Sequence, residues 1–342
     1  INSSADNIKG TVSNTGSLNL SGGTLSKAVS GSGKTTISGN TTNSGGINQG
    51  VTVNSGVTLT NNAALGSDSG TITNSGTINT NASNIKGTVA NNNTLNLSGG
   101  TLSKAVSGAG TTNITGAVTS NSAISQAINI IAAGDLTISA GNIGGAVTNA
   151  GDLILTGGTL SKVVSGAGLT TISGNTTNNG GINQAVKVNS GVTLANNAAL
   201  GSANGAITNA GTINSNADYI KGTVANSGSL NLSGGTLSKA VSGSGTTNIT
   251  GNTTNNAGIN QGVNINNGVT LTNNAALGSD SGKITNAGTI NTNASNIKGT
   301  VTNNNALNLS GGTLSKAVSG NGTTTISGNT TVSYTHLRAH ET

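Results

Sequence analysis

Two aspartates are the residues whose type and spacing could support acid/base chemistry in this chain of 342 residues. Asp135 and Asp152 each open a Gly-Asp-Leu segment, and the two segments are close together in the sequence. On neighbouring turns of a repetitive structure they could form a glycosidase-like acid/base pair or part of a cation site. Other repeats carry no carboxylate at the position of Asp152, where they have Ser17, Thr94, Ser229 and Ala306. No Arg, His or Glu precedes residue 332, so we expect no catalytic, cofactor-binding or metal residues and no enzyme.

Lysines recur in two registers that could build a basic edge. The first register contains Lys9, Lys86, Lys221 and Lys298, and the second contains Lys27, Lys104, Lys162, Lys239 and Lys316. We expect pairs such as Lys9 and Lys27 to lie one coil apart and to recur about every four coils along one edge. Such an edge could bind host glycans, matrix or other anionic surface polymers. The interpretation that we favour is that exposed lysines keep strands from pairing side by side. Nucleic acid is not an expected partner, because no aromatic residues accompany the lysines.

Threonines form a third recurrent signal, as in Thr58-Leu-Thr60 and Thr71-Ile-Thr73. Hydroxyls and methyls in a flat array would suit an ice-binding solenoid. Outward positions nevertheless mix Thr, Asn and Ser, which favours the simpler interpretation that threonine is a good residue for the outer face of a strand.

The composition limits the elements that can position these residues. There are 55 glycines, only 6% of residues are charged, and Pro, Cys, Met, Trp and Phe are absent. Disulfides and thiolate metal sites are therefore excluded, and a thick core filled by aromatic side chains is not expected. No apolar run is long enough to span a membrane as a helix. Because Ile1 falls in mid-pattern, we expect the chain to be a fragment.

An internal repeat organises the whole sequence. The pentad Ile8-Lys-Gly-Thr-Val12 and its variants start at Ile8, Ile85, Ile143, Ile220 and Ile297. We call each such block a superrepeat. Three of the four intervals are equal, and the one from Ile85 to Ile143 is shorter by about 19 residues, a deficit that suits one unit of a repeat array. In the short block, Ile124–Asn142 stands where two units stand elsewhere. We therefore expect a structural unit of about 19 residues and divide the first superrepeat into 8–26, 27–46, 47–66 and 67–84.

Apolar residues alternate with polar ones over short runs, as in Leu18-Asn-Leu20 and Leu95-Asn-Leu97. A period of two predicts strands with one buried face, and the intervening Gly and Asn residues suit corners. The predicted fold is all-β: a β-solenoid of parallel strands with coils of about 19 residues, forming a single array over residues 1–331. Corner asparagines such as Asn14 and Asn74 are expected to stack in amide ladders.

The periodic pattern ends at Thr331, and Val332–Thr342 has another character. This stretch holds both histidines, the only Arg and the only Glu. It resembles one reading frame of a sequencing adapter translated into protein, so we expect 332–342 to be a non-native tail. His336 and His340 have the spacing of metal ligands on one helical face, but a site there would be accidental.

The segment Gly31-Ser-Gly-Lys-Thr-Thr-Ile-Ser-Gly-Asn-Thr-Thr-Asn-Ser-Gly-Gly46 resembles the passenger-associated repeat of bacterial autotransporters, and it returns at 166–181. The coils are also similar to those of filamentous haemagglutinin-like adhesins. The resemblance implies a right-handed parallel β-helix, secreted or held at the outer surface of a Gram-negative-type cell. It would act as an adhesin stalk or structural spacer with distributed weak contacts. An ice-binding solenoid and a carbohydrate-active β-helix enzyme are the alternatives.

Overall fold

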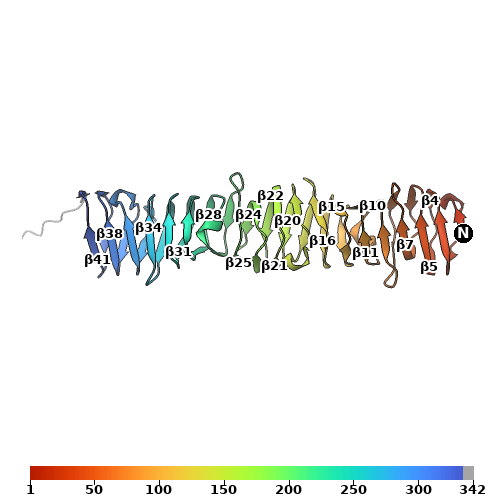
Figure 1. Cartoon of the computed structure of the whole chain (residues 1–342), viewed down its shortest axis with the longest axis horizontal. Helices are drawn as coiled ribbons and strands as arrows, with labels where there is room; N and C mark the ends of the chain where they lie inside the picture. Colours follow the sequence, from red (N-terminus) through yellow and green to blue (C-terminus); the bar gives the residue numbers. More distant parts are fainter. Residues whose placement is uncertain (334–342) are drawn as a thin grey trace, which may run out of the picture. The chain divides into compact units, whose positions relative to one another are not determined.

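The computed structural model describes residues 1–333, which fall into two compact units, the first spanning Ile1–Thr171 and the second beginning at Ile172. Both units are β-solenoids, as predicted, and each is a stack of coils whose strands pair in parallel with the coils before and after (Figure 1). Within the described residues there is no α-helix, and the only helical segments are single 3₁₀ turns. None of them is long and apolar enough to cross a membrane.

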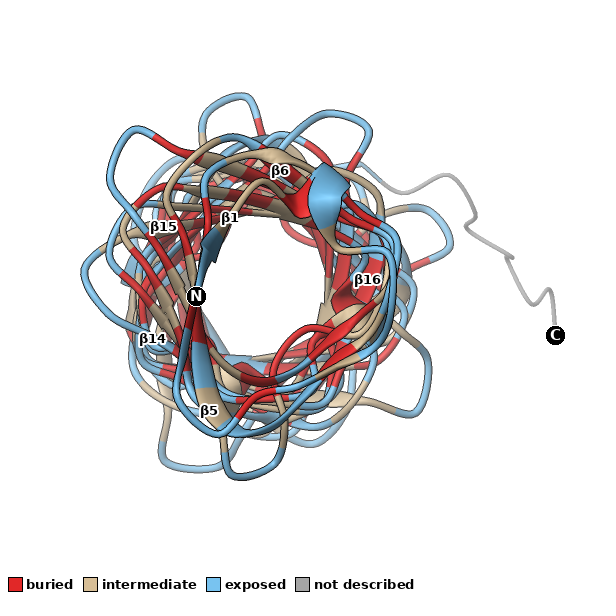
Figure 2. Cartoon of the chain, turned by 90° about the vertical axis from the view of Figure 1, so that its right-hand side faces the viewer, coloured by how far each residue is buried: buried red, intermediate tan, exposed pale blue. Residues whose placement is uncertain are grey.

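Most strands bury alternate residues, as the two-residue period predicts. In β12 (Thr94–Leu97), Leu95 and Leu97 are fully buried, while Asn96 between them points outward and is half-buried. Figure 2 shows buried residues lining the inside of the coils and exposed residues on the outer loops. The core is therefore a thin column of Val, Ile and Leu that needs no aromatic side chain to fill it.

In the first unit the strands form three rows, which we call faces A, B and C. Face A contains β1 (Asn2–Ser3), β3 (Ser17–Leu20), the second parts of β5 (Val29–Ile37) and β7 (Ile47–Val53), β9 (Ile72–Asn74), β11 (Val89–Asn91), β14 (Val106–Ser107), η3 (Ala140–Asn142) and β21 (Gly158–Leu160). Face B contains β2 (Val12–Ser13), the first parts of β5 and β7, η2 (Ala82–Asn84), β13 (Gly100–Leu102), β16 (Ala117–Ser120), β18 (Asp135–Ile138) and β20 (Asp152–Leu155). Face C contains η1 (Ala5–Asn7), β4 (Gly23–Leu25), β6 (Thr41–Asn43), β8 (Thr58–Asn61), β10 (Thr77–Thr80), β12, β15 (Thr111–Ile114), β17 (Ala127–Ile130), β19 (Val147–Asn149) and the start of β22 (Val164–Ile172).

The second unit has the same three-row arrangement. One row contains β23 (Thr176–Asn178), β25 (Thr193–Asn196), β27 (Thr212–Ser215), β29 (Ser229–Leu232), the second parts of β31 (Val241–Ile249) and β33 (Ile259–Ile265), β35 (Ile284–Asn286), β37 (Val301–Asn303) and β40 (Val318–Ser319). Another contains the second part of β24 (Ile182–Val188), β26 (Ile207–Asn209), β28 (Val224–Asn226), the first parts of β31 and β33, η5 (Ala294–Asn296), β39 (Gly312–Leu314) and β42 (Thr330–Val332). The third contains η4 (Ala217–Tyr219), β30 (Gly235–Leu237), β32 (Thr253–Asn255), β34 (Thr270–Asn273), β36 (Thr289–Thr292), β38 (Ala306–Leu309) and β41 (Thr323–Ile326).

The coils are slightly shorter than expected. Along face A the partner of Leu18 is Thr35, and Asn74 pairs with Asn91, so these coils take about 17 residues each. The expected coil length was taken from the number of residues that the short superrepeat lacks, which correspond to one coil. That coil is longer than most, because Asn61 pairs with Thr80 at a sequence separation of 19.

The length of the superrepeat suggested four whole coils, but the strand pairing shows a different number. Pairing leads from Leu18 through Thr35, Val51 and Ile72 to Val89, four coils later on face A. The sequence copy of Leu18 is Leu95, which lies beyond Val89 and pairs with Ile78 and Thr112 on face C. Because each coil has three faces, a superrepeat spans four and one third coils. Successive copies of a residue therefore lie on different faces.

The second unit repeats this shift. Pairing leads from Leu230 through Thr247, Val263 and Ile284 to Val301. The copy of Leu230 is Leu307, which follows Val301 in the sequence and lies in another row, opposite Ile290. The one-third shift is therefore a property of the superrepeat and not of one location.

The short superrepeat has lost one whole coil, as predicted. In the intact first superrepeat, Thr41 pairs with Leu59, which in turn pairs with Ile78. In the short one, Val118, the copy of Thr41, pairs directly with Leu136, the copy of Ile78. Removal of a complete coil leaves the faces of all later strands in phase, because each coil contacts only its neighbours.

The recurrent Ser-Gly-Gly-Thr-Leu motif is explained by a close approach between coils. Gly23 has a φ of +91°, and a Cβ built on it would lie 2.1 Å from Oδ2 of Asp6 on η1. Gly100 repeats this geometry, with Asn81 beside η2 in the place of the aspartate. Only glycine tolerates both the positive φ and the contact, so the motif marks where the chain packs closely against the 3₁₀ turn of the preceding coil.

Buried asparagines stabilise the corners, as predicted for Asn74. Its Nδ2 donates to Oδ1 of Asn91 in the next coil at 2.7 Å, and both side chains are fully buried. Asn14 forms no such ladder: its amide donates to the backbone oxygens of Gly16 and Lys34 instead. Amide ladders of this kind satisfy polar groups that would otherwise cost free energy in the core.

Candidate functional site: an asparagine groove at the superrepeat junctions

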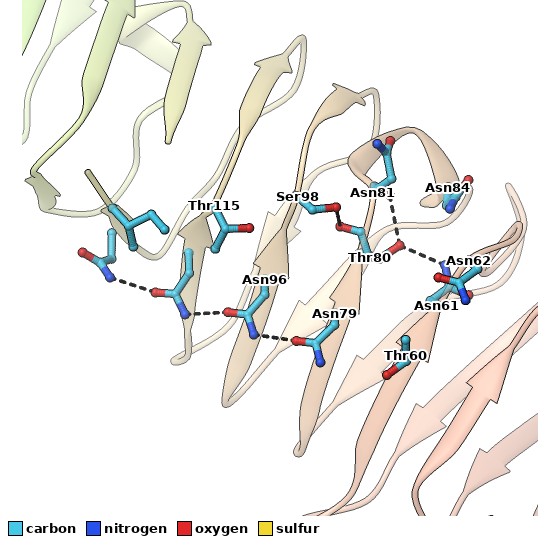
Figure 3. Close-up of a pocket in the computed structure, with 13 residues that line it drawn as sticks. Thr60, Asn61, Asn62, Asn79, Thr80, Asn81, Asn84, Asn96, Ser98 and Thr115 are labelled. Atoms are coloured by element: carbon cyan, nitrogen blue, oxygen red, sulfur yellow. Dashed lines mark hydrogen bonds between the residues drawn. The ribbon is translucent and has the colours of Figure 1, made fainter. Parts of the chain in front are cut away.

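A second set of asparagines forms an outward ladder on face C. Asn96 donates from Nδ2 to Oδ1 of Asn79 at 2.7 Å, and Asn113 donates to Asn96 at the same distance (Figure 3). Asn129 extends the row with a bond of 3.1 Å to Asn113. These side chains are half-buried, and each is the central outward residue of its strand.

All the amides of this ladder point in one direction. Each Nδ2 donates toward the preceding coil, so the first member, Asn79, accepts from Asn96 while its own Nδ2 donates to no protein group in the part of the chain described. Hydrogen-bonded chains polarise their members, which strengthens the donor at the free end. The ladder therefore presents a donor to solvent at Asn79.

A groove of about 720 Å³ runs along this ladder. Figure 3 shows Ser98 and Thr115 beside the ladder and Asn81 and Asn84 on the turn at its end. The Thr115 hydroxyl donates to the backbone oxygen of Leu97, which fixes this wall. Of the described residues, those that line the groove supply amides, hydroxyls and the half-exposed Ile131, and none is ionisable. Such a surface can donate and accept hydrogen bonds without selecting for charge.

The same groove recurs in the second unit, where a superrepeat ends and the next one begins. One copy, of about 480 Å³, has Asn291 and Asn308 as its ladder and Asn296 on η5. The other, of about 390 Å³, has Asn214 and Asn231 as its ladder. Within residues 1–333, neither copy is lined by an ionisable group apart from a tyrosine.

Tyr219 distinguishes this last copy. It occupies on η4 the position that Asn84 and Asn296 hold in the other two grooves, and 39% of its surface is exposed. Sequence reasoning missed it as a functional residue. The available signal was that Tyr219 is the only aromatic residue before the tail and replaces an asparagine of the repeat.

The structure brings Asp135 and Asp152 together as predicted. They are directly opposite each other on β18 and β20, and both are exposed. No group of three or more His, Cys, Asp and Glu residues suited to a metal ion occurs within residues 1–333. Like charges directly opposite in neighbouring strands repel each other, so this pair destabilises the local pairing.

The prediction of a single basic edge is wrong. Lys27 lies at the corner between β4 and β5, which leads from face C to face B. Its copy Lys104 lies between β13 and β14, at the corner from face B to face A. The one-third shift of the superrepeat separates lysines that the sequence placed in one row.

Two of the lysines are also neutralised by aspartates. Lys104 pairs with Asp68 at 2.5 Å, and Lys316 pairs with Asp280 in the same way. The hydrogen bond and charge of each lysine lower the pKa of the aspartate carboxyl. These pairs are exposed, so they reduce the positive charge of the surface more than they stabilise the fold.

The remaining aspartates of the periodic region have a structural role. Oδ1 of Asp6 accepts a hydrogen bond from the backbone nitrogen of Thr24 at 2.9 Å. Asp218 accepts one from Thr236 at 2.8 Å in the same geometry. Both carboxylates thus connect a 3₁₀ turn to the next coil. His336 and His340 lie outside the described residues.

Comparisons of the chain with protein-family models, with curated proteins and with solved structures found no match. The resemblance to autotransporter passengers therefore rests on the sequence pattern alone.

Proposed function

We propose that this chain is a structural spacer of a secreted or cell-surface protein, with repeated weak contacts along its coils. The observation that carries the proposal is the one-third shift of the superrepeat. It distributes each recurrent surface feature over different faces, whereas a single binding face would need the copies to be aligned.

The stacking of coils also supports a spacer. Stability in such an array is close to a sum over neighbouring coils, so length can change in steps of one coil. The short superrepeat shows that one such step has been accommodated, with Val118 paired directly to Leu136. The proposed location outside the cell follows from the autotransporter-like segment Gly31–Gly46 and is part of the proposal.

The grooves are the more suitable surface for weak contacts. The lysine corners point in different directions, and Asp68 and Asp280 neutralise two of them. The grooves also lie on different rows, but they recur with the same amide and hydroxyl lining at the superrepeat junctions, and within the described residues no carboxylate lines them. Repeated weak sites on one chain gain avidity without a strong one.

The spacer role can be tested by placing the full chain between an outer-membrane anchor and an epitope tag on a bacterial surface. We expect tag accessibility to a large antibody to fall in steps as whole coils are deleted. A matched variant carries the same number of Gly-Ser residues in place of the chain. Accessibility that does not depend on coil number, or that equals the Gly-Ser control, contradicts a spacer.

One observation favours the ice-binding alternative. Thr58, Thr77, Thr94 and Thr111 lie in register on successive coils of face C, a more regular row than the sequence suggested. The row beside them, however, is the hydrogen-bonded asparagine ladder and not a second row of threonines. Thermal hysteresis of the full chain that disappears in Thr94→Lys would support this alternative over the spacer.

A further inference from the structure

We infer that the groove containing Tyr219 is a binding site for a neutral saccharide. The inference is independent of the spacer role, because it concerns one junction whose aromatic residue the other junctions lack. The groove is lined by Tyr219 on η4, by Asn214 and Asn231 of the outward ladder, and by Ser233 and Thr250 on the neighbouring coils.

Hydrogen bonds of the η4 turn hold the backbone of Tyr219 in place. Oδ1 of Asn216 accepts a hydrogen bond from the nitrogen of Asp218, and Ala217 donates to the backbone oxygen of Gly234 at 2.8 Å. Ile220, directly after the tyrosine, is buried. The turn therefore fixes the backbone from which the ring projects before any ligand arrives, which reduces the entropy lost on binding.

The fold does not need an aromatic residue at this position. Asn84 and Asn296 occupy the same place on η2 and η5, in 3₁₀ turns of the same length and capping. A partly exposed tyrosine in a periodic region that otherwise has no aromatic residue is unexplained by the core. Exposed aromatic surface beside a polar groove is typical of a site that binds a ligand with both apolar and polar parts.

The ladder supplies a strong donor beside the ring. Asn264, Asn248 and Asn231 each donate to the preceding asparagine, at 2.9, 2.7 and 2.6 Å, and the chain ends at Asn214. Among the described residues, Nδ2 of Asn214 has no protein partner, and the next residue in the row is Ala195. The other two grooves have Thr60 and Thr272 there. The terminal amides of those two grooves, Asn79 and Asn291, likewise donate to no protein group among the described residues, so the free donor is common to the three grooves and the tyrosine ring distinguishes this one.

The chemistry of the lining selects an uncharged ligand that is rich in hydroxyls. In the part of the chain that the structure describes, no Lys, Arg, Asp or Glu lines the groove, so nothing compensates the charge of a phosphate, a sulfate or a carboxylate. A stacked nucleobase would bring phosphates with it and would need basic residues nearby. A pyranose ring has an apolar C–H face for the tyrosine and hydroxyl groups that both donate and accept for the amides.

The test uses the full chain labelled with ¹³C-tyrosine, which contains only Tyr219 and Tyr334, so the second ring serves as an internal reference. The probes are cellohexaose, maltohexaose, chitohexaose and laminarihexaose, with a heparin hexasaccharide as the charged comparison. We expect saturable shifts of the Tyr219 ring with at least one neutral probe, and affinity at least tenfold weaker for heparin. No shift with any of the four, or a preference for heparin, overturns the inference.

Two substitutions separate a binding role from a structural one. Tyr219→Asn restores the residue of the other junctions, so the melting temperature should stay the same while calorimetric affinity for the selected probe falls at least tenfold. Asn84→Tyr places a ring in the groove of about 720 Å³ and should add a second site to the full chain. Unchanged affinity in Tyr219→Asn contradicts a site at this residue, whatever the outcome of the spacer experiment.

Discussion

Two neighbouring aliphatic residues of β20 provide a direct test of which side of the strand faces the core. Leu153 is fully buried and lies opposite Leu136 of the preceding coil, whereas Ile154 points outward and is only half-buried. Both side chains have four carbons, and they are adjacent in one strand. Leu153→Ala and Ile154→Ala therefore remove the same amount of apolar material from the two sides of the sheet.

The expected magnitudes differ clearly. Leu153→Ala removes three buried carbons, worth about 0.8 kcal/mol each in transfer free energy. The cavity left in a thin, tightly packed column adds to this, so the total loss should be about 2–5 kcal/mol. Ile154 loses little burial on truncation, and the expected loss is below about 1 kcal/mol.

Native-state hydrogen exchange is the suitable assay, because a stack of coils can open locally without unfolding as one unit. We expect Leu153→Ala to reduce the protection of amides in β18 and β20 and to leave distant coils of the same unit unaffected. The change in Ile154→Ala should be small. Equal losses, or a larger loss for Ile154, would refute the register, since a slip by one residue exchanges the two faces.

Three further outcomes follow from the coil arrangement and the ion pairs. Deletion of Thr58–Gly76 removes one whole coil and should change the melting temperature, measured by calorimetry, by only a few degrees. The shorter deletion Thr58–Ser67 moves all later strands to other faces and should leave a largely unfolded product. Equal melting behaviour of the two deletions would contradict the claim that only the loss of a complete coil is tolerated. Asp152→Asn removes the repulsion from Asp135 and should stabilise the chain by less than about 1 kcal/mol in urea unfolding, while destabilisation would indicate that the pair holds a cation. Lys104 lowers the pKa of Asp68 in the folded chain, so their pair adds to the free energy of unfolding at pH values above the ordinary aspartate range. This contribution is lost as the pH falls through the lowered pKa. The free energy of unfolding of Asp68→Asn should lack this small pH dependence, and a pH profile identical to that of the unsubstituted chain would refute the pair's contribution.

The alternation of Leu95, Asn96 and Leu97 was sufficient to predict the strands and the parallel stack, because a period of two has few other structural solutions. The offset between Asp135 and Asp152 equals one coil, so their proximity could also be predicted. The coil length was overestimated because the missing coil is a long one. In the first superrepeat it carries the additional loop around Asp68, which lengthens the step along face A from Val51 to Ile72.

The one-third shift could not be inferred from the sequence. The length of a superrepeat is close to four units of the expected size. All three faces also carry similar alternating patterns, so nothing in the sequence distinguishes Leu18 on face A from Leu95 on face C. The groove depends on the direction of the amide ladder and on the projection of η4 beside it. Tyr219 was visible as a change within the repeat, but its significance came only from its position next to Asn214.

The most direct test of the four-and-one-third-coil superrepeat is disulfide formation between introduced cysteines, since the chain has none of its own. Thr73 and Ala90 are direct neighbours on β9 and β11, with half-buried outward side chains. Strands of adjacent coils are about 4.8 Å apart, within the range that a disulfide can bridge. Thr73→Cys with Ala90→Cys should therefore cross-link rapidly under mild oxidation, while Thr73→Cys with Asn96→Cys should not, because Asn96 lies on face C opposite Asn79. Cross-linking of Thr73 to Asn96 in preference to Ala90 would show that the superrepeat is four whole coils and would contradict the account.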